Sequence, residues 1–464
     1  MRPTVHVGRP FRGANDVARE RNAGLMKVAE AEDVRFGRFE EFAAARAKVE
    51  PSWLRDRRRA AILRFRQLGL PTTREEEWRF TPVRSIATTE FEPATARSIP
   101  VTRAAVEPFA FAGLDGPELV FVNGRFAPDI SRPSSLPAGV RVTSLSEILT
   151  SDGALVDDNL GRYVKFEQHG FTALNTAWMI DAAVVLIPKN LVVEAPIHLL
   201  YLSDAERPAA AHPRTLVLVG EGSAARMIES YAGPAGQVYL TNALTEIVVG
   251  ANAQLDHYKV QRESTSAYHV SSTHLTLDRS AVFTTHSITL GGHLVRNDIN
   301  ALLGAEGTSC TLNGLYLAGG DRLVDNHTAI DHAKPHSESH ELYKGVLNDR
   351  AHGVFNGKIY VRPDAQKTDA KQTNQVLLLS KDATINTKPQ LEIFADDVKC
   401  THGATVGQIN DEALFYLRAR GIGRDEARQL LIHAFAEDII ERIHIAPVRK
   451  ALEQALLKEL PLKD

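Results

Sequence analysis

Short apolar segments alternate with tight polar turns through the middle of the chain, from residue 184 to about residue 408. The segments are rich in β-branched residues and are bounded by turn residues, a pattern that predicts β-strands. The turns resemble one another and recur at spacings of 30, 28 and 26 residues, at 219–224, 249–253, 277–281 and 303–307, with a later copy at 379–383. A repeated unit of strand, polar turn, small residue and strand, with a period of about 30, predicts a stacked β-solenoid.

Two other architectures fit this pattern less well. A parallel α/β sheet needs a helical segment between successive strands, and no helical period of that length separates these segments. A β-sandwich needs hairpin turns, yet the Asn-Gly pairs after Gly124 are few, at 313–314 and 356–357. We therefore expect a mainly β fold with a parallel β-helix at its core.

Helical patterns lie before the β-rich region. Residues from about 16 to 68 predict helices, because apolar side chains fall on one face at helical spacing. These are Leu54, Ala61, Ile62, Phe65 and Leu68. The arginines within 55–59 lie largely on other faces, and we expect them to be solvated. Further along, 119–126 predicts a hairpin with an Asn123-Gly124 turn.

The C-terminal tail predicts helices with a broad apolar surface. Asn410 can cap the first helix, and a second is expected from about residue 424 to 443. The second helix carries more apolar residues than one packing face needs, including Leu430, Leu431, Phe435 and Ile439. Such a surface either docks a partner or forms a helical hairpin that caps the solenoid end, and the pattern leaves both readings open. The expected divisions are an N-terminal helical region (1–110), a β-helix core (111–408) and a C-terminal helical domain (409–464).

Composition narrows the function classes. The chain has 464 residues, with 54 Lys and Arg against 57 Asp and Glu, a net charge of -3. This balance gives no electrostatic footprint for nucleic acid or an anionic membrane. No secretory signal and no membrane-length apolar run is found, and two cysteines in so long a chain form no disulfide framework. These features indicate a protein of the reducing cytoplasm.

The Cys400-x-His402 pair is the strongest candidate for metal chemistry. On a strand, residues i and i+2 point to the same face, so this thiol and this imidazole would stand side by side. Such a pair can bind a soft metal, but two ligands do not complete a site, and the missing ligands must come from elsewhere. A lone cysteine is more often a small core residue. Cys310, the second cysteine, fits an ordinary strand with inward alternation.

Other groups of residues are weaker candidates for a functional site. Residues 353–359 superficially resemble a phosphate-binding loop, but the spacing between the glycines is one residue short and Ile359 replaces the hydroxyl that would bind magnesium. His332, His336 and His340 have helical metal-site spacing, but Pro335 disfavours a helix there. A carbohydrate-active β-helix enzyme would need several carboxylates along one groove. The available acids are Asp325, Asp331, Glu338 and Glu341, which otherwise serve as ordinary solvated charges.

Several stretches of this sequence together resemble one known family. They are KCTHGATVGQ at 399–408, EALFYLRARGI at 412–422, QKTDAKQ at 366–372, LLLS at 377–380 and INTKPQLEI at 385–393, with LPT at 70–72, EEW at 76–78 and FVNG at 121–124 nearer the front. This wording is similar to the SufB/SufD family of iron–sulfur cluster assembly proteins, and within it to the SufD branch. One departure is Thr401, where serine is more familiar, and the hydroxyl is kept.

The resemblance implies a right-handed parallel β-helix between helical N- and C-terminal regions, and a place in a complex with SufB and the ABC-type ATPase SufC. The C-terminal helices would dock SufC, and the last strands would pair with SufB. Cys400 and His402 would then be transient iron–sulfur ligands at that interface, with His402 the firmer assignment. The chain itself would be a non-catalytic scaffold that holds no cofactor stably, and flavin binding by the complex is left open.

Two rival interpretations stay open on sequence alone. A β-helix enzyme acting on carbohydrate predicts a carboxylate-lined groove and turnover without partners. A purely structural subunit would pair with a second copy through its solenoid end, and Cys400 and His402 would be packing residues.

Overall fold

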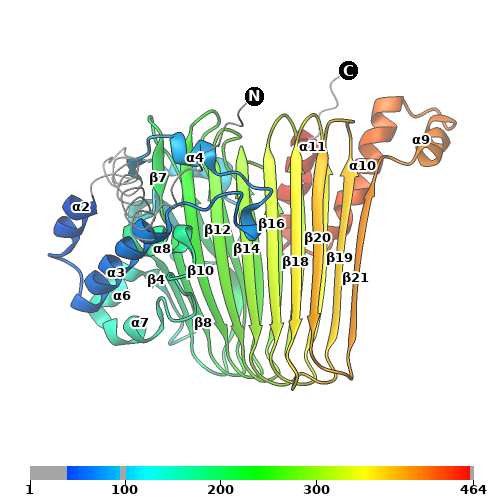
Figure 1. Ribbon diagram of the computed structural model, residues 1–464. Helices are drawn as coiled ribbons and strands as arrows, with labels where there is room; N and C mark the ends of the chain where they lie inside the picture. Colours follow the sequence, from blue (N-terminus) through cyan, green and yellow to red (C-terminus); the bar gives the residue numbers. More distant parts are fainter. Residues whose placement is uncertain (1–38, 95–100, 460–464) are drawn as a thin grey trace, which may run out of the picture.

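The computed structural model describes residues 39–94 and 101–459, and two long β-sheets dominate it (Figure 1). Sheet A contains β4 (Arg141–Ser144), β5 (Ala183–Ile187), β7 (Ala209–Ala211), β8 (Arg214–Val219), β10 (Tyr239–Val249), β12 (Tyr268–Leu277), β14 (Leu294–Leu303), β16 (Leu323–His332), β18 (His352–Val361) and β20 (Thr384–Ile393), with β1 (Glu92–Pro93) beside β7. Sheet B contains β3 (Arg125–Phe126), β2 (Glu118–Val122), β6 (Val192–Leu202), β9 (Ala224–Ala232), β11 (Gln254–Arg262), β13 (Val282–Thr289), β15 (Ser309–Ala318), β17 (Glu338–Leu347), β19 (Asp369–Leu378) and β21 (Lys399–Gly407).

Successive strands alternate between the two sheets, so the chain coils around a central lumen, the space between the inner faces of sheets A and B. From β5 to β21 the neighbours within each sheet run parallel and lie one coil apart; for example, Leu240 pairs with Tyr268, and Tyr268 pairs with Leu294. This arrangement confirms the predicted parallel β-solenoid. The repeat seen in the sequence is therefore the length of one coil.

The turns from sheet A to sheet B explain why similar turn sequences recur. From the β5–β6 turn to the β18–β19 turn, each places one residue in the left-handed backbone region, including Asn252 (φ 56°), Ser280 (φ 56°) and Gly307 (φ 70°). Glycine and asparagine adopt this conformation at low cost. Adjacent turns also hydrogen-bond to one another, since the Asn252 N–H donates to the Arg279 carbonyl (2.8 Å) and the Ser280 N–H to the Glu306 carbonyl (2.9 Å).

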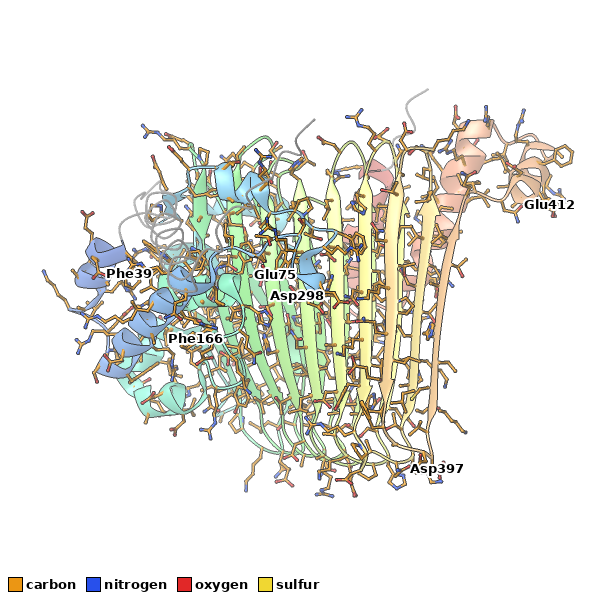
Figure 2. The ribbon with its side chains drawn as sticks, in the orientation of Figure 1. Phe39, Glu75, Phe166, Asp298, Asp397 and Glu412 are labelled. Carbon is orange, nitrogen blue, oxygen red and sulfur yellow. The ribbon has the colours of Figure 1, made fainter. Side chains whose placement is uncertain are left out.

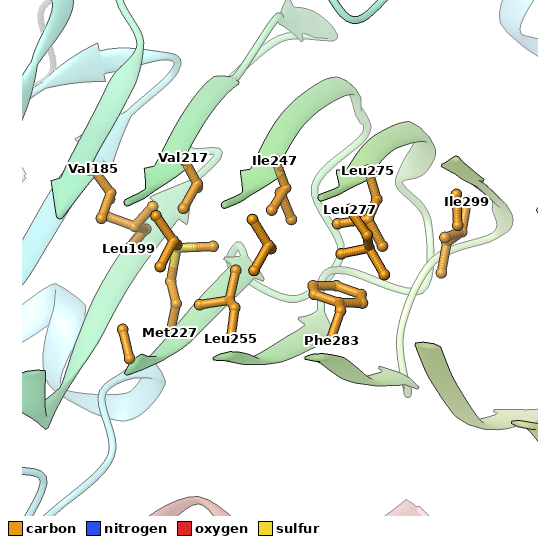
Figure 3. Packing of buried hydrophobic residues seen from close by; sticks show 14 of the residues in the cluster. Val185, Leu199, Val217, Met227, Ile247, Leu255, Leu275, Leu277, Phe283 and Ile299 are labelled. Atoms are coloured by element: carbon orange, nitrogen blue, oxygen red, sulfur yellow. The ribbon is translucent and has the colours of Figure 1, made fainter. Parts of the chain in front are cut away.

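The first half of the lumen is filled by aliphatic and aromatic side chains from both sheets (Figure 3). Val217, Ile247 and Leu275 of sheet A face Leu255 and Phe283 of sheet B, and all five are buried. Burying each such side chain contributes about 1.5–3 kcal/mol. The inward-facing apolar positions of successive strands therefore form one continuous core.

The first end of the solenoid is covered by a hairpin, an antiparallel strand and helices. The predicted hairpin is confirmed: β2 and β3 are antiparallel, with Asn123 (φ 52°) and Gly124 (φ 79°) in the turn. Strand β4 pairs antiparallel with β5. Three helices follow β4, namely α6 (Leu145–Ser151), α7 (Gly153–Asn159) and α8 (Gly170–Trp178). They lie within the range 111–408 that the sequence analysis gives to the β-helix, so the parallel coils begin only at β5 and β6.

Helices α2 (Phe39–Arg46) and α3 (Ser52–Leu68) lie outside α8, and the helices expected between residues 16 and 38 fall outside the described residues. The predicted apolar face of α3 is correct for Leu54, Ala61, Ile62 and Phe65, which are buried. The prediction of a solvated arginine run is wrong for Arg58. Its guanidinium is buried, pairs with Glu50 (2.7 Å) and donates to the Ala177 carbonyl of α8 (2.8 Å).

A segment that we call the strap, residues 71–88, crosses the outer face of sheet A. It contains the short helices η1 (Glu76–Trp78) and α4 (Arg84–Thr88), and its blue ribbon runs in front of the sheet in Figure 1. Trp78 packs between the Arg296 guanidinium (4.1 Å from its ring centroid) and the Phe171 ring (5.5 Å).

The C-terminal helices are α9 (Asp411–Arg418), α10 (Arg424–Ile440) and α11 (Ala446–Glu459). Apolar residues of α10 and α11 pack on the outer face of sheet B, where Ile432, Ile439 and Val448 join one cluster with Ile288 and Leu315. Helix α9 projects beyond β21 (Figure 1). The tail therefore covers a side of the solenoid and not its end. Within the described chain, no helix is long and apolar enough to cross a membrane.

Candidate functional site

The Cys-x-His pair lies on β21, the last strand of sheet B, whose other neighbour is β19. Cys400 is in register with Ala370, and His402 with Gln372. Ala370 and Gln372 are buried and face the lumen, so Cys400 and His402 also lie on the lumen side. Because no further coil covers them, Cys400 is half-buried and His402 is exposed. Their placement on one strand face is as predicted, and their role as ligands stays a prediction.

The electrostatics around Cys400 keep its thiol protonated. Burial raises the pKa of Cys400, and the Asp369 carboxylate raises it further. A soft metal would therefore have to displace the thiol proton on binding. No group of three or more His, Cys, Asp or Glu residues with metal-binding geometry occurs in residues 39–94 and 101–459. Within the described residues, Cys400 and His402 therefore have no third metal ligand beside them.

The second cysteine, Cys310, lies too far from Cys400 to bind the same metal ion. The register runs from Cys310 through Ser339 and Ala370 to Cys400, so the two sulfurs occupy one column three strands apart. At about 4.8 Å per strand, this is roughly 14 Å, far beyond a shared metal ion. Cys310 is fully buried, and burial raises the pKa of its thiol. It is a core residue, as expected.

Two further polar residues lie behind His402 in the lumen. Glu341, Gln372 and His402 are in register on β17, β19 and β21. Gln372 is 1% exposed and Glu341 3% exposed. The amide atoms of Gln372 find no hydrogen-bond partner among the described residues, and the Glu341 carboxylate has only the Thr328 hydroxyl near it. Burial raises the pKa of Glu341 to about 7, which the Thr328 hydroxyl partly opposes.

Gln372 reaches across the lumen towards β18. A Cβ atom at Gly357 would overlap the side-chain nitrogen of Gln372, so only glycine leaves room for this amide. Sequence reasoning missed Gln372 as a site residue and treated Glu341 as a candidate groove acid. Gln372 precedes His402 by one coil and Glu341 precedes Gln372 by one coil, and this regular spacing is the signal that could have found them.

The predicted partner-binding residues of α10 do not share one surface. Leu430 is 48% exposed, Leu431 and Phe435 are half-buried, and Ile439 is buried against sheet B. Lys344 of β17 also holds this helix, through Asp438 (2.8 Å) and the Phe435 ring. Much of the apolar surface noted in the sequence is therefore used within the chain.

The exposed apolar surface of the tail is centred on α9 instead. Phe415 is 73% exposed and Tyr416 56% exposed, and no residue of α9 is buried. Figure 2 places Glu412 of this helix beyond the last strand. Helix α9 contacts α10, which carries the exposed Leu430. We call Phe415, Tyr416 and Leu430 the α9 patch.

The carboxylates expected of a carbohydrate-active enzyme do not gather in a groove. Asp325 is buried and paired with Arg296 (2.7 Å), Asp331 pairs with Arg362 (2.6 Å), and Glu341 lies in the lumen. Residues 353–359 belong to β18, which excludes a phosphate loop there. His332, His336 and His340 lie on β16, a turn and β17, and not on one helix.

A cavity of about 490 Å³ lies between the strap and the outer face of sheet A. Glu75 of the strap and Asp298 of β14 both line it (Figure 2). Its cationic residues are paired: Arg296 with Asp298 (2.8 Å), and Lys358 with Glu392 (2.6 Å). Among the described residues that line it, the cavity therefore has no cluster of free cations of the kind that a phosphate group requires.

Comparisons with known proteins place both parts of the chain in one family. Residues 36–199 match the family described as "SufBD protein N-terminal region", and residues 201–435 match "SUF system FeS cluster assembly, SufBD core domain". The chain is 35% identical over 417 residues to an iron–sulfur cluster assembly SufBD family protein of Synechocystis, covering 88% of this chain and 91% of that protein. It is 32% identical over 396 residues to the iron–sulfur cluster assembly protein SufD of Escherichia coli, covering 85% and 90%, respectively. With SufD of Bacillus subtilis it shares 28% identity over 302 residues, covering 64% and 68%.

Proposed function

Because the chain belongs to the SufBD family of iron–sulfur cluster assembly proteins, we propose that it is the SufD-type, non-catalytic subunit of a cytoplasmic assembly complex. It pairs with SufB through the open end of its solenoid and binds the ATPase SufC through its C-terminal helices. A nascent iron–sulfur cluster is its cargo and is held only transiently. His402, with Cys400 beside it, supplies ligands from this side of the interface.

One observation carries the proposal: the solenoid is closed at its first end and open at its last. Among the described strands, β20 and β21 pair on one edge only. Their other edges present backbone groups that a neighbouring solenoid can pair with. His402 and Cys400 lie at this edge with the rest of their ligand set missing. A partner strand would cover the edge and could supply the missing ligands in one step.

Replacing His402 with Ala is expected to lower cluster formation by the complete complex by about tenfold or more, because a ligand is worth at least as much as its outer-shell partners. The fold should be unchanged, since the side chain is exposed. Cluster formation is measured from iron and sulfide incorporation by the purified complex. The matched control is His340→Ala, which removes a half-exposed histidine facing outward on β17. Equal cluster yields from the two variants would exclude this role for His402.

The α9 patch is the surface that we assign to SufC. It is exposed, apolar and attached to the chain by helices anchored on sheet B. Movement of an ATPase bound there could be passed to the solenoid end, because α9 directly follows β21. A deletion from Arg424 onward would be a poor test. It would strip α10 and α11 from sheet B and expose the core residues Ile288 and Leu315.

Replacing Phe415 or Leu430 with Asp is expected to weaken SufC capture by about tenfold or more, as removal of an interface anchor does. Neither substitution touches a buried residue, so the fold should persist. Capture is measured as the SufC concentration needed for half-maximal binding to the full-length chain. Leu457→Asp is the control, because Leu457 is 67% exposed but lies on α11. Equal losses from all three variants, or no loss from any, would refute the assignment to α9.

A further inference from the structure

The lumen behind His402 contains hydrogen-bonding groups that the proposed metal role does not use. Gln372 and Glu341 occupy the next two strands of the same column, both nearly fully buried. Both amide atoms of Gln372 are unpaired within the described chain, and the Glu341 carboxylate has only the nearby Thr328 hydroxyl as a donor. An unpaired buried polar atom costs about 1–3 kcal/mol and is rare in native proteins, so the Gln372 amide beside an under-satisfied carboxylate calls for an explanation.

We propose that His402, Gln372 and Glu341 form a hydrogen-bonded relay that positions the His402 imidazole for its cargo. The proposal deepens the function proposed above and rests on it. Side chains in register on neighbouring parallel strands have Cα atoms about 4.8 Å apart, a separation that a rotation of long side chains spans. The relay is made when the His402 ring turns inward over the open end of the lumen.

The donors and acceptors match along the column. One ring N–H of a neutral His402 donates to the Gln372 carbonyl oxygen, and the Gln372 amide nitrogen donates to a Glu341 carboxylate oxygen. Gly357 keeps the space beside the Gln372 amide open. One ring nitrogen then donates its proton within the lumen. The other ring nitrogen keeps a free lone pair, with which it can bind a metal ion at the SufB interface. Histidines that bind metals commonly donate their second N–H in this way, which fixes the tautomer and raises the basicity of the ligand.

Cys400, unlike His402, has no free hydrogen-bonding side chain behind it in the described part of the lumen. Behind it in its own column lie Ala370 and then Ser339. Ala370 has no polar side-chain atom, and the Ser339 hydroxyl is already bonded to His332 (2.9 Å). Cys400 instead packs beside apolar residues that include Ile359 and Ala370. The lumen is thus built to orient His402 in particular.

The test is Gln372→Met, a replacement of similar size that cannot accept or donate these bonds. In the complete complex we expect about tenfold slower cluster formation, the usual effect of losing an outer-shell partner. The thermal midpoint should change little, because methionine fills the same space and the cost of burying the amide is removed together with its hydrogen bonds. A merely structural Gln372 would not combine lower activity with undiminished stability. In ¹⁵N-histidine spectra of the full-length chain, the His402 ring signals should shift towards a mixture of tautomers.

Matched variants make the outcome decisive. Gln375→Met alters the same residue type on the outward face of β19 and should behave as wild type. Glu341→Met should reproduce the slower cluster formation and the ring shifts, whereas Glu341→Gln, which keeps an acceptor oxygen, should retain most of the activity. If Gln372→Met matches wild type in cluster formation and in the ring signals while His402→Ala is inactive, the relay is refuted and the proposed function stands. If His402→Ala is itself fully active, the proposed function fails, and the ring signals alone decide whether the relay exists.

Discussion

Replacing Glu50 with Ala is expected to lower the free energy of unfolding by about 3–5 kcal/mol, the usual cost of leaving one partner of a buried ion pair alone. The Glu50 carboxylate accepts hydrogen bonds from Arg58 Nε (2.9 Å) and Nη2 (2.7 Å), and both side chains are 1% exposed. Arg46 adds a third bond (2.7 Å). Without Glu50, the buried Arg58 guanidinium keeps one hydrogen bond, to the Ala177 carbonyl of α8, and the Phe42 ring at 5.2 Å, but no counter-charge among the described residues. The measurement is urea denaturation followed by circular dichroism.

Two comparisons separate the ion pair from side-chain loss in general. The double variant Glu50→Leu/Arg58→Met removes both charges and should recover most of the lost stability, because apolar side chains can fill the site. Arg207→Ala breaks a pair with Glu92 whose side chains are 70% and 41% exposed, and it should cost less than about 1 kcal/mol. A Glu50→Ala variant no less stable than Arg207→Ala would show that this pair does not hold α3 against α8.

The solenoid could be predicted from sequence because one local signal repeats. Most coils place a left-handed residue at the same turn, and Gly222, Asn252 and Gly307 mark that position without reference to distant parts of the chain. The Asn123-Gly124 hairpin was predictable for the same reason. The prediction that Cys400 and His402 share one strand face was also possible, because it depends only on the alternation of side chains along a strand.

Features that depend on distant partners were not predictable in this way. Arg58 looks like one arginine in a solvated run until Glu50 and the Ala177 carbonyl are brought to it. The apolar surface of α10 looks free until Ile288 and Leu315 on the outer face of sheet B are seen beneath Ile439.

The column of Glu341, Gln372 and His402 needs the pairing register of three strands. Coil length varies along the chain, so a fixed repeat does not supply that register. A one-residue slip would turn each side chain away from the lumen.

Replacing Asp325 with Ala is expected to loosen the strap from sheet A by about 3 kcal/mol, because two buried cations lose their shared carboxylate. Asp325 is fully buried, accepts from Arg296 Nη1 (2.7 Å) and from the Thr81 hydroxyl of the strap (2.5 Å), and forms an ion pair with His327 Nε2 (3.0 Å). His327 also contacts Glu77 of the strap (3.2 Å). Hydrogen exchange of the amides at 76–82 measures the local opening free energy. The control is Asp331→Ala. Asp331 lies on β16, like Asp325, but its ion pair with Arg362 is at the surface, so this variant should leave the amides at 76–82 as protected as in wild type.

The same cluster gives the stability of the folded chain a pH dependence with a defined sign. Burial lowers the pKa of His327, but Asp325 and Glu77 more than offset this and raise it from 6.5 to about 9. A raised pKa in the folded state stabilises the protein fully below the unfolded value of about 6.5, and the stabilisation is lost as pH rises through 9. The contribution of His327 to the free energy of unfolding of the wild-type chain, measured by urea denaturation, should therefore fall by about 2–3 kcal/mol between pH 6.5 and pH 9.5. In Asp325→Ala the decline over this range should be smaller by most of that amount, since His327 keeps only Glu77, and an equal decline in both proteins would show that Asp325 does not raise the pKa of His327.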